Sequence, residues 1–150
     1  MCRKCDSYQG HHPFLTHRNI NFNLLISVFM NKKIGLFWLR DDFRISKNYG
    51  LIEATTQHDQ VVVFYLYKKL TYKYQEAQKW WLSKSLINFR KNLEKFNINL
   101  EIIETGSFKI FFDNLFKKND FSFYWNKVYE PDYIKFDKYF AYLVKDILIF

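Results

Sequence analysis

Cysteine is nearly absent from this sequence: the 150 residues hold only Cys2 and Cys5, both close to the amino terminus. Two thiols at one end cannot form a disulfide framework for the body of the chain. This excludes the class of small disulfide-stabilised secreted proteins and favours a reducing, cytoplasmic location. The pair Cys2-x-x-Cys5 with His11 and His12 has the residue types of a zinc site. Because a second spaced pair of ligands is missing, we expect no metal site.

Signatures of several function classes are also missing. No apolar run reaches the roughly 18 residues that a membrane-spanning helix needs. No glycine-rich phosphate loop follows the first expected strand, which disfavours a classical dinucleotide or P-loop site. The sequence has four histidines, His11, His12, His17 and His58, and none of them lies in a recognisable sequence pattern of a Ser/His/Asp catalytic triad. We therefore predict no catalytic residues in this chain.

Basic residues are abundant but not concentrated. The formal net charge is +8 and the isoelectric point is near 9.4, a balance that favours contact with polyanions. No single Lys/Arg run is dense enough to form a dedicated nucleic-acid-binding arm. We interpret the excess charge as a solvated basic surface rather than a DNA-binding face.

The sequence divides into an extension and one domain. Ile20–Met30 is apolar, but asparagines interrupt it and Asn31-Lys32-Lys33 replaces the cleavage site of a signal peptide. We expect residues 1–31 to be a poorly structured extension without a role in the fold. Residues 32–150 form one domain, for which a content of 49% hydrophobic and 21% aromatic residues supplies the core.

From residue 33 onward, strand-like and helix-like patterns alternate. The expected strands are Ile34–Leu39, Val61–Tyr67, Leu100–Glu104, Phe121–Trp125 and Ile147–Phe150, and the expected helices are 49–57, 80–96, 108–118 and 132–145. Strands separated by helices indicate an α/β fold: a doubly wound, mostly parallel five-stranded sheet, Rossmann-like, with helices on both faces. Because the chain stops in a strand, we expect a fragment, truncated before a further domain.

Local signals mark the ends of the helices. Leu82, Leu86, Phe89, Leu93 and Phe96 recur at helical spacing, which predicts one buried stripe that reaches Phe96. The next residue, Asn97, is typical of the left-handed conformation that ends a helix. Ser107 is an expected N-cap, and Pro131 is expected at the start of the last helix. Trp80 and Trp81, which open the second helix, are expected to pack in the core or at an interface.

Two polar clusters follow expected strands. Arg40, Asp42 and Arg44 follow the first, and Asn126, Tyr129 and Glu130 follow the fourth. If these two strands are neighbours where the strand order reverses, both clusters border one ligand-binding crevice. Two alternatives stay open. Asp42 and Arg44 could pair with each other and only hold their loop. Glu130 could be a carboxylate that stabilises the first turn of the following helix through its dipole.

Three stretches share the motifs of one known family. They are Trp38-Leu-Arg-Asp-Asp-Phe-Arg-Ile-Ser-Lys-Asn48, Lys79-Trp-Trp-Leu82 with Ser85-Leu86, and Trp125-Asn-Lys-Val-Tyr-Glu-Pro131. In order and spacing they resemble the amino-terminal domain of DNA photolyases and cryptochromes. The departures are Asp41 for a basic residue, Lys47 for an acidic one, Tyr49 for proline and Asn97 for glycine.

The resemblance implies the antenna domain of a deoxyribodipyrimidine photolyase, a carbon-carbon lyase that uses light to split cyclobutane pyrimidine dimers in DNA. It implies an antenna chromophore, methenyl-tetrahydrofolate or 8-hydroxy-deazaflavin, contacted by Asn126, Tyr129 and Glu130 and also by Arg40, Asp42 and Arg44. The family's helical FAD domain is absent from this sequence, so a monomeric fragment, inactive alone, is expected. The implied partners are that helical domain and, for the full-length parent, damaged DNA.

Three other interpretations stay open. A cryptochrome-type blue-light photoreceptor shares the same domain. A free-standing nucleotide-binding α/β module would have the same broad architecture, and a non-functional remnant would leave an apolar docking face exposed.

Overall fold

The computed structural model describes residues 34–67, 76–117, 121–143 and 147–149. The amino-terminal extension, with Cys2, Cys5, His11 and His12, lies outside the described residues. The prediction of no metal site at these residues therefore stays a prediction.

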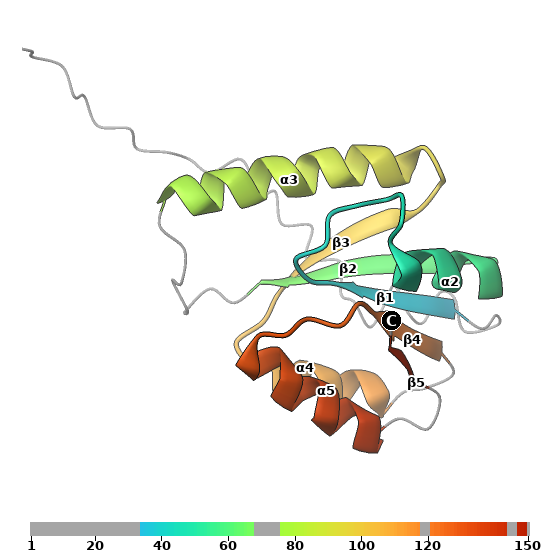
Figure 1. Ribbon diagram of the computed structural model, residues 1–150, viewed down its shortest axis with the longest axis vertical. Coiled ribbons are helices and arrows are strands. Elements are labelled where there is room, and N and C mark those ends of the chain that lie inside the picture. The colour runs from blue at the N-terminus through green and yellow to red at the C-terminus, as the bar shows by residue number, and fades with distance from the viewer. Residues whose placement is uncertain (1–33, 68–75, 118–120, 144–146, 150) are drawn as a thin grey trace, which may run out of the picture.

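Strands and helices alternate along the whole described chain (Figure 1). The elements are β1 (Ile34–Leu39), α2 (Tyr49–Gln57), β2 (Val61–Tyr67), α3 (Glu76–Glu94), β3 (Asn99–Glu104), α4 (Phe108–Phe116), β4 (Phe121–Trp125), α5 (Pro131–Leu143) and β5 (Ile147–Ile149). The strand order in the sheet is β3-β2-β1-β4-β5, and every neighbouring pair is parallel. This confirms an α/β, Rossmann-like fold with a parallel sheet.

The number of full strands differs from the prediction. Four strands of five to seven residues form the body of the sheet. The expected fifth strand is reduced to the three residues of β5, which pair with Phe123, Tyr124 and Trp125 at one edge.

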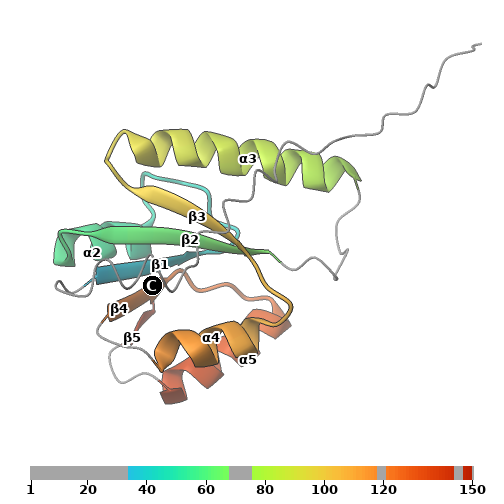
Figure 2. The ribbon, with the colours of Figure 1, turned by 180° about the vertical axis from the view of Figure 1, so that it is seen from behind.

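Helices cover both faces of the sheet (Figures 1 and 2). Side chains of β1 alternate between the two faces, as the pleat of a strand requires. Leu36 and Trp38 pack with Phe112 of α4 and Phe140 of α5, whereas Phe37 and Leu39 join the core beneath α2 and α3. The uninterrupted apolar sequence of β1 is therefore explained by burial on both faces.

The end of α3 shows both a correct and a wrong prediction. Asn97 has a φ of 57°, and the N–H of Ile98 donates to the carbonyl of Leu93 at 3.2 Å, so the left-handed helix end is confirmed. The apolar stripe, however, stops one turn early. The helix ends at Glu94, and the Phe96 side chain is 61% exposed.

Other local predictions had similarly mixed outcomes. The Ser107 hydroxyl accepts from the N–H of Ile110, as an N-cap should, and α5 starts at Pro131. Core packing is wrong for the tryptophan pair, because Trp80 and Trp81 are 62% and 59% exposed. Trp81 contacts the Phe43 ring edge to face, with ring centroids 6.2 Å apart, but most of both indole surfaces stays exposed.

Within the part of the chain that the structure describes, no helix combines the length and apolarity needed to cross a membrane.

Candidate ligand-binding crevice

The crevice forms where β1 and β4 lie side by side. Trp38 of β1 is in register with Trp125 of β4, so the loops that follow these two strands leave the sheet at the same edge. In the sheet, β2 lies on one side of β1 and β4 lies on the other, so the strand order reverses between β1 and β4. Open α/β sheets bind ligands at such a reversal. The predicted adjacency of β1 and β4 is confirmed.

A pocket of about 480 Å³ occupies this position. The end of β1, the loops that follow β1 and β4, and the first residue of α2 line it: Phe37, Trp38, Arg40, Asp41, Asp42, Arg44, Lys47, Tyr49, Asn126, Lys127 and Val128. Four of the six predicted contact residues are therefore brought together: Arg40, Asp42, Arg44 and Asn126.

Asn126 connects the two sides of the crevice. Its Nδ2 donates to a carboxylate oxygen of Asp42 at 3.0 Å and to Oδ1 of Asn48 at 2.9 Å. Its Oδ1 accepts from the backbone N–H of Gly50 at 3.0 Å. The amide thereby joins the end of β4 to the loop after β1 and to the first turn of α2.

Asp42 and Arg44 form an ion pair with each other. Arg44 Nε donates to Asp42 Oδ1 at 2.7 Å, and a second guanidinium nitrogen donates to Oδ2 at 2.9 Å. The Arg44 side chain and backbone N–H hold the pKa of the Asp42 carboxyl below its ordinary value, although partial burial opposes them. The loop-holding interaction considered as an alternative for this pair is therefore present, and Asp42 is a carboxylate at neutral pH.

Arg40 lies at the buried end of the crevice. Its side chain pairs with the carboxylate of Asp137 on α5, and its guanidinium carbon lies 4.1 Å from the centroid of the Trp38 ring and 4.8 Å from that of Tyr133. The Nε atom of this buried side chain has no hydrogen-bond partner among the described residues. A buried donor without a partner is costly, so Arg40 Nε could accommodate an acceptor that reaches it.

Tyr129 and Glu130 do not line the pocket. Tyr129 is 78% exposed, with the Lys127 ammonium 5.4 Å from its ring centroid. Glu130 is also exposed, but it lies close enough to Asp41 to act on its charge. Desolvation raises the pKa of the Asp41 carboxyl, Glu130 raises it further, and Arg40 opposes both. These two predicted residues therefore flank the crevice instead of forming it.

Sequence reasoning missed two important residues of the site. Asn48 is fully buried. Its Nδ2 donates to the carbonyl of Arg44 at 3.0 Å. Its Oδ1 accepts from the N–H of Leu51 at 3.1 Å, so Asn48 is the N-cap of α2. An asparagine directly before an expected helix was the available signal. Lys47, the other residue, adopts a φ of 61° and joins Lys127 at the pocket as a second lysine, which no local pattern indicated.

The walls of the crevice combine aromatic side chains and cations with the Asn126 amide and the carboxylates of Asp41 and Asp42. Among the described residues, no three His, Cys, Asp or Glu side chains gather as a metal site would require.

Comparisons with known proteins bear on the family and the fold of this chain. The family model described as DNA photolyase matches residues 35–147. The fold is similar to the crystal structure of a bacterial class III photolyase from Agrobacterium tumefaciens, with a TM-score of 0.65 and 25% sequence identity over 79% of this chain and 25% of that one. The chain thus spans about a quarter of the length of that photolyase. No curated protein matches the sequence significantly.

Proposed function

Because this chain belongs to the DNA photolyase family, we propose that it is the antenna-chromophore-binding domain of a deoxyribodipyrimidine photolyase. The observation that carries the proposal is the crevice at the carboxyl ends of β1 and β4, which is lined by residues of the first and third family motifs. Its volume lies within the roughly 300–1,000 Å³ of small-molecule sites.

The lining suits a flat, conjugated ligand, as folates and deazaflavins both are. Lys47 and Lys127 would attract the carboxylates of a folate's glutamate tail. Arg40 Nε offers a buried donor to a ring carbonyl or ring nitrogen. Because the Asn126 amide already makes three hydrogen bonds, it would hold the walls in place instead of contacting the chromophore directly.

Glu130 and Tyr129 would make contacts at the margin. Both are exposed beside the crevice, where the Glu130 carboxylate could accept from N–H groups of a chromophore that extends past Asp41. When bound, the antenna would absorb light and transfer the excitation energy to FAD.

Repair itself would require parts outside this sequence. In the family, a helical domain holds FAD and receives the damaged base after it is flipped out of the duplex. We propose that such a domain and damaged DNA are the partners of this one, and that the protein acts in the cytoplasm as a monomer. The body of the domain contains no cysteine, which fits a reducing compartment.

The test is a titration of the folded chain with methenyl-tetrahydrofolate and, separately, with 8-hydroxy-deazaflavin, followed by the shift of the absorption band. Lys47→Glu combined with Lys127→Glu should lower the affinity for methenyl-tetrahydrofolate by roughly tenfold or more, since the two new carboxylates would repel its glutamate tail. The matched control, Lys84→Glu with Lys91→Glu, makes the same charge change on the exposed face of α3 and should leave binding unchanged.

Two results would contradict this assignment. If a well-folded chain binds neither chromophore, the antenna role is wrong. If ATP or AMP raises the melting temperature while the chromophores do not, the domain is a nucleotide-binding module instead. Glu130→Ala locates the ligand. A loss of chromophore affinity as large as the loss caused by the two lysine substitutions would place the chromophore over the margin and not inside the crevice.

A further inference from the structure

The outer face of α3 carries the two exposed tryptophans of the chain. Trp80 and Trp81 are largely open to solvent, whereas Trp38 and Trp125 are buried. Figures 1 and 2 show α3 as an outer layer of the fold, with the sheet on its inner side. An edge-to-face contact with Phe43 positions the Trp81 ring. Adjacent indole rings left in water indicate a contact surface, because burying them would be favourable.

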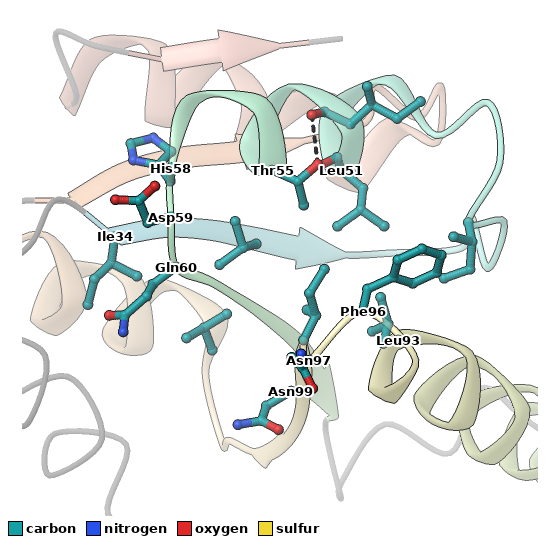
Figure 3. A pocket seen from close by; sticks show the side chains of 15 residues that line it. Ile34, Leu51, Thr55, His58, Asp59, Gln60, Leu93, Phe96, Asn97 and Asn99 are labelled. Atoms are coloured by element: carbon teal, nitrogen blue, oxygen red, sulfur yellow. Dashed lines mark hydrogen bonds between the residues drawn. The ribbon is translucent and has the colours of Figure 1, made fainter.

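Packing on the sheet fixes the opposite side of the helix. Leu86, Phe89 and Leu93 are buried in the core beneath α3. Figure 3 shows Leu93 and Phe96 at the groove that separates the end of α3 from α2. A rotation of α3 that buried the two tryptophans would expose this core stripe, so the indole rings have to face outward.

Lysines follow the tryptophans at helical spacing. Lys84 lies one turn after Trp80, with its ammonium nitrogen 5.6 Å from the centroid of the Trp80 ring, and Lys91 lies two turns further along the same face. Both lysines are exposed, and neither forms an ion pair with a carboxylate that the structure describes. A helix gathers residues spaced in this way on one side. The outer face of α3 is therefore both aromatic and cationic, although no dense Lys/Arg run marks it in the sequence.

This charge selects among the partners that could cover the face. A second copy of α3 would bring lysines against lysines, which disfavours self-association. A neutral apolar partner would bury Lys84 and Lys91 without a counter-charge. Single-stranded nucleic acid satisfies both kinds of side chain, because its bases stack on aromatic rings and its phosphates attract lysine. From Trp80 to Lys91 the helix rises about 16 Å, which matches roughly five nucleotides at about 3.4 Å each.

We propose that the outer face of α3 binds single-stranded nucleic acid, with bases stacked on Trp80 and Trp81 and phosphates beside Lys84 and Lys91. Stacking and ionic attraction read no base edges, so the binding is independent of sequence and of damage to the bases. None of these four residues lines the crevice between β1 and β4. The inference therefore does not rest on chromophore binding.

Fluorescence anisotropy of a dye-labelled oligothymidylate of about 12 nucleotides, titrated with the full chain, tests the proposal. Trp80→Leu with Trp81→Leu should weaken binding by roughly tenfold or more, because apolar surface remains but stacking is lost. Trp80→Phe with Trp81→Phe keeps flat rings and should retain most of the affinity. An oligouridylate of the same length is the RNA arm. It should bind about as well as the DNA strand, since neither kind of contact reads the 2′-hydroxyl.

Salt dependence tests the two lysines separately. Lys84→Gln with Lys91→Gln should reduce the slope of the logarithm of affinity against the logarithm of salt concentration by about 1.4, since each phosphate contact on a single strand contributes about 0.7. Lys135→Gln with Lys138→Gln is the matched control. It removes the same charge from exposed positions of α5, on the opposite face of the sheet (Figure 1), and should leave the slope unchanged.

Three results would overturn the proposal, provided that circular dichroism shows each variant to be folded. The first is no binding of oligothymidylate at low salt. The second is binding that the leucine substitutions at Trp80 and Trp81 leave unchanged, which would mean a general attraction of polyanions to a basic protein. The third is binding of poly-glutamate with the same dependence on both tryptophans, which would assign the face to an acidic protein partner.

Discussion

Asn126 and Asn48 face each other across the β1–β4 boundary, with Nδ2 of the first 2.9 Å from Oδ1 of the second. The two asparagines lie 78 positions apart in sequence, and each also contacts the loop after β1. This pair therefore sets the distance between the two walls of the crevice, and several expectations depend on it.

Asn126→Ala should lower the free energy of unfolding by about 2–3 kcal/mol, because it leaves Asp42, Asn48 and the Gly50 N–H without their common partner. Urea unfolding followed by circular dichroism would measure the loss. Asn88→Ala, at an exposed position of α3, should change stability by no more than about 0.5 kcal/mol. Equal effects of the two substitutions would show that the Asn126 network contributes nothing.

Gly50→Ala should be destabilising despite the higher helix propensity of alanine. A Cβ at this position would lie 2.7 Å from Asn126 Oδ1 and 2.9 Å from Phe37 Cε2, and such overpacking costs about 1–3 kcal/mol. Gly106→Ala is the matched control, since a Cβ there meets nothing within 4 Å; it should be neutral or slightly stabilising. A Gly50→Ala protein as stable as the parent would mean that the crevice walls can move apart without cost.

Lys47→Gly should raise stability by about 1 kcal/mol, because glycine adopts the positive φ of this residue without the steric cost that a Cβ imposes. Lys47→Ala retains the Cβ and should show no such gain, while it removes the same ammonium group. Thermal unfolding of the two variants separates backbone strain from charge. If both variants gained equally, charge repulsion and not strain would be the cause.

Asp41 and Asp42 should affect the pH dependence of stability with opposite signs. The hydrogen bond from Arg44 lowers the pKa of the Asp42 carboxyl. The contribution of Asp42 to stability is therefore present above the unfolded pKa and is lost as the pH falls through the folded pKa. Desolvation and the nearby charge of Glu130 raise the pKa of the Asp41 carboxyl above 3.8. The contribution of Asp41 to stability is therefore present below the unfolded pKa and is lost as the pH rises through the folded pKa.

Asparagine substitutions at the two positions test these signs. At neutral pH, Asp42→Asn should be less stable than the parent and Asp41→Asn more stable. In acid, both differences should shrink as the parent carboxylates become protonated. Urea midpoints measured from neutral to acid pH provide the comparison, and differences of the same sign at neutral pH would contradict the environments described for these two side chains.

Asp137→Asn should cost about 3–5 kcal/mol, because it leaves the buried Arg40 guanidinium without its counter-charge. Lys109→Ala breaks an exposed ion pair with Asp113 and should leave the stability almost unchanged. Chemical denaturation would compare them. Arg40→Met with Asp137→Leu should recover most of the loss, since an apolar pair leaves no unpaired charge.

Local patterns were sufficient to predict the elements of the fold. The β-branched run Val61–Tyr67 and the position of Pro131 identify β2 and the start of α5, and both are observed as expected. The error at Phe96 has a local cause. Its spacing fits the apolar stripe, but the helix ends at Glu94, and the N–H of Phe96 donates to the carbonyl of Leu93 three residues back, so Phe96 lies in the closing turn and off the stripe. Periodicity alone cannot show which of two adjacent signals prevails.

The candidate site depended on long-range geometry, so it was predicted less completely. The parallel-sheet rule correctly brought Arg40, Asp42, Arg44 and Asn126 to one crevice. It could not show that the chain after Asn126 runs past the pocket and leaves Tyr129 and Glu130 exposed. Nor could it show that Asn126 makes its hydrogen bonds within the protein, because its partners come from a loop far away in sequence.

The distribution of the four tryptophans has a spectroscopic consequence. Trp38 and Trp125 are shielded from water, whereas Trp80 and Trp81 are open to it. A water-soluble quencher should therefore extinguish the long-wavelength part of the emission first and leave a blue-shifted remainder from the core. The intrinsic fluorescence of this protein thus carries two separable signals, one that reports on the surface of α3 and one that reports on the integrity of the sheet.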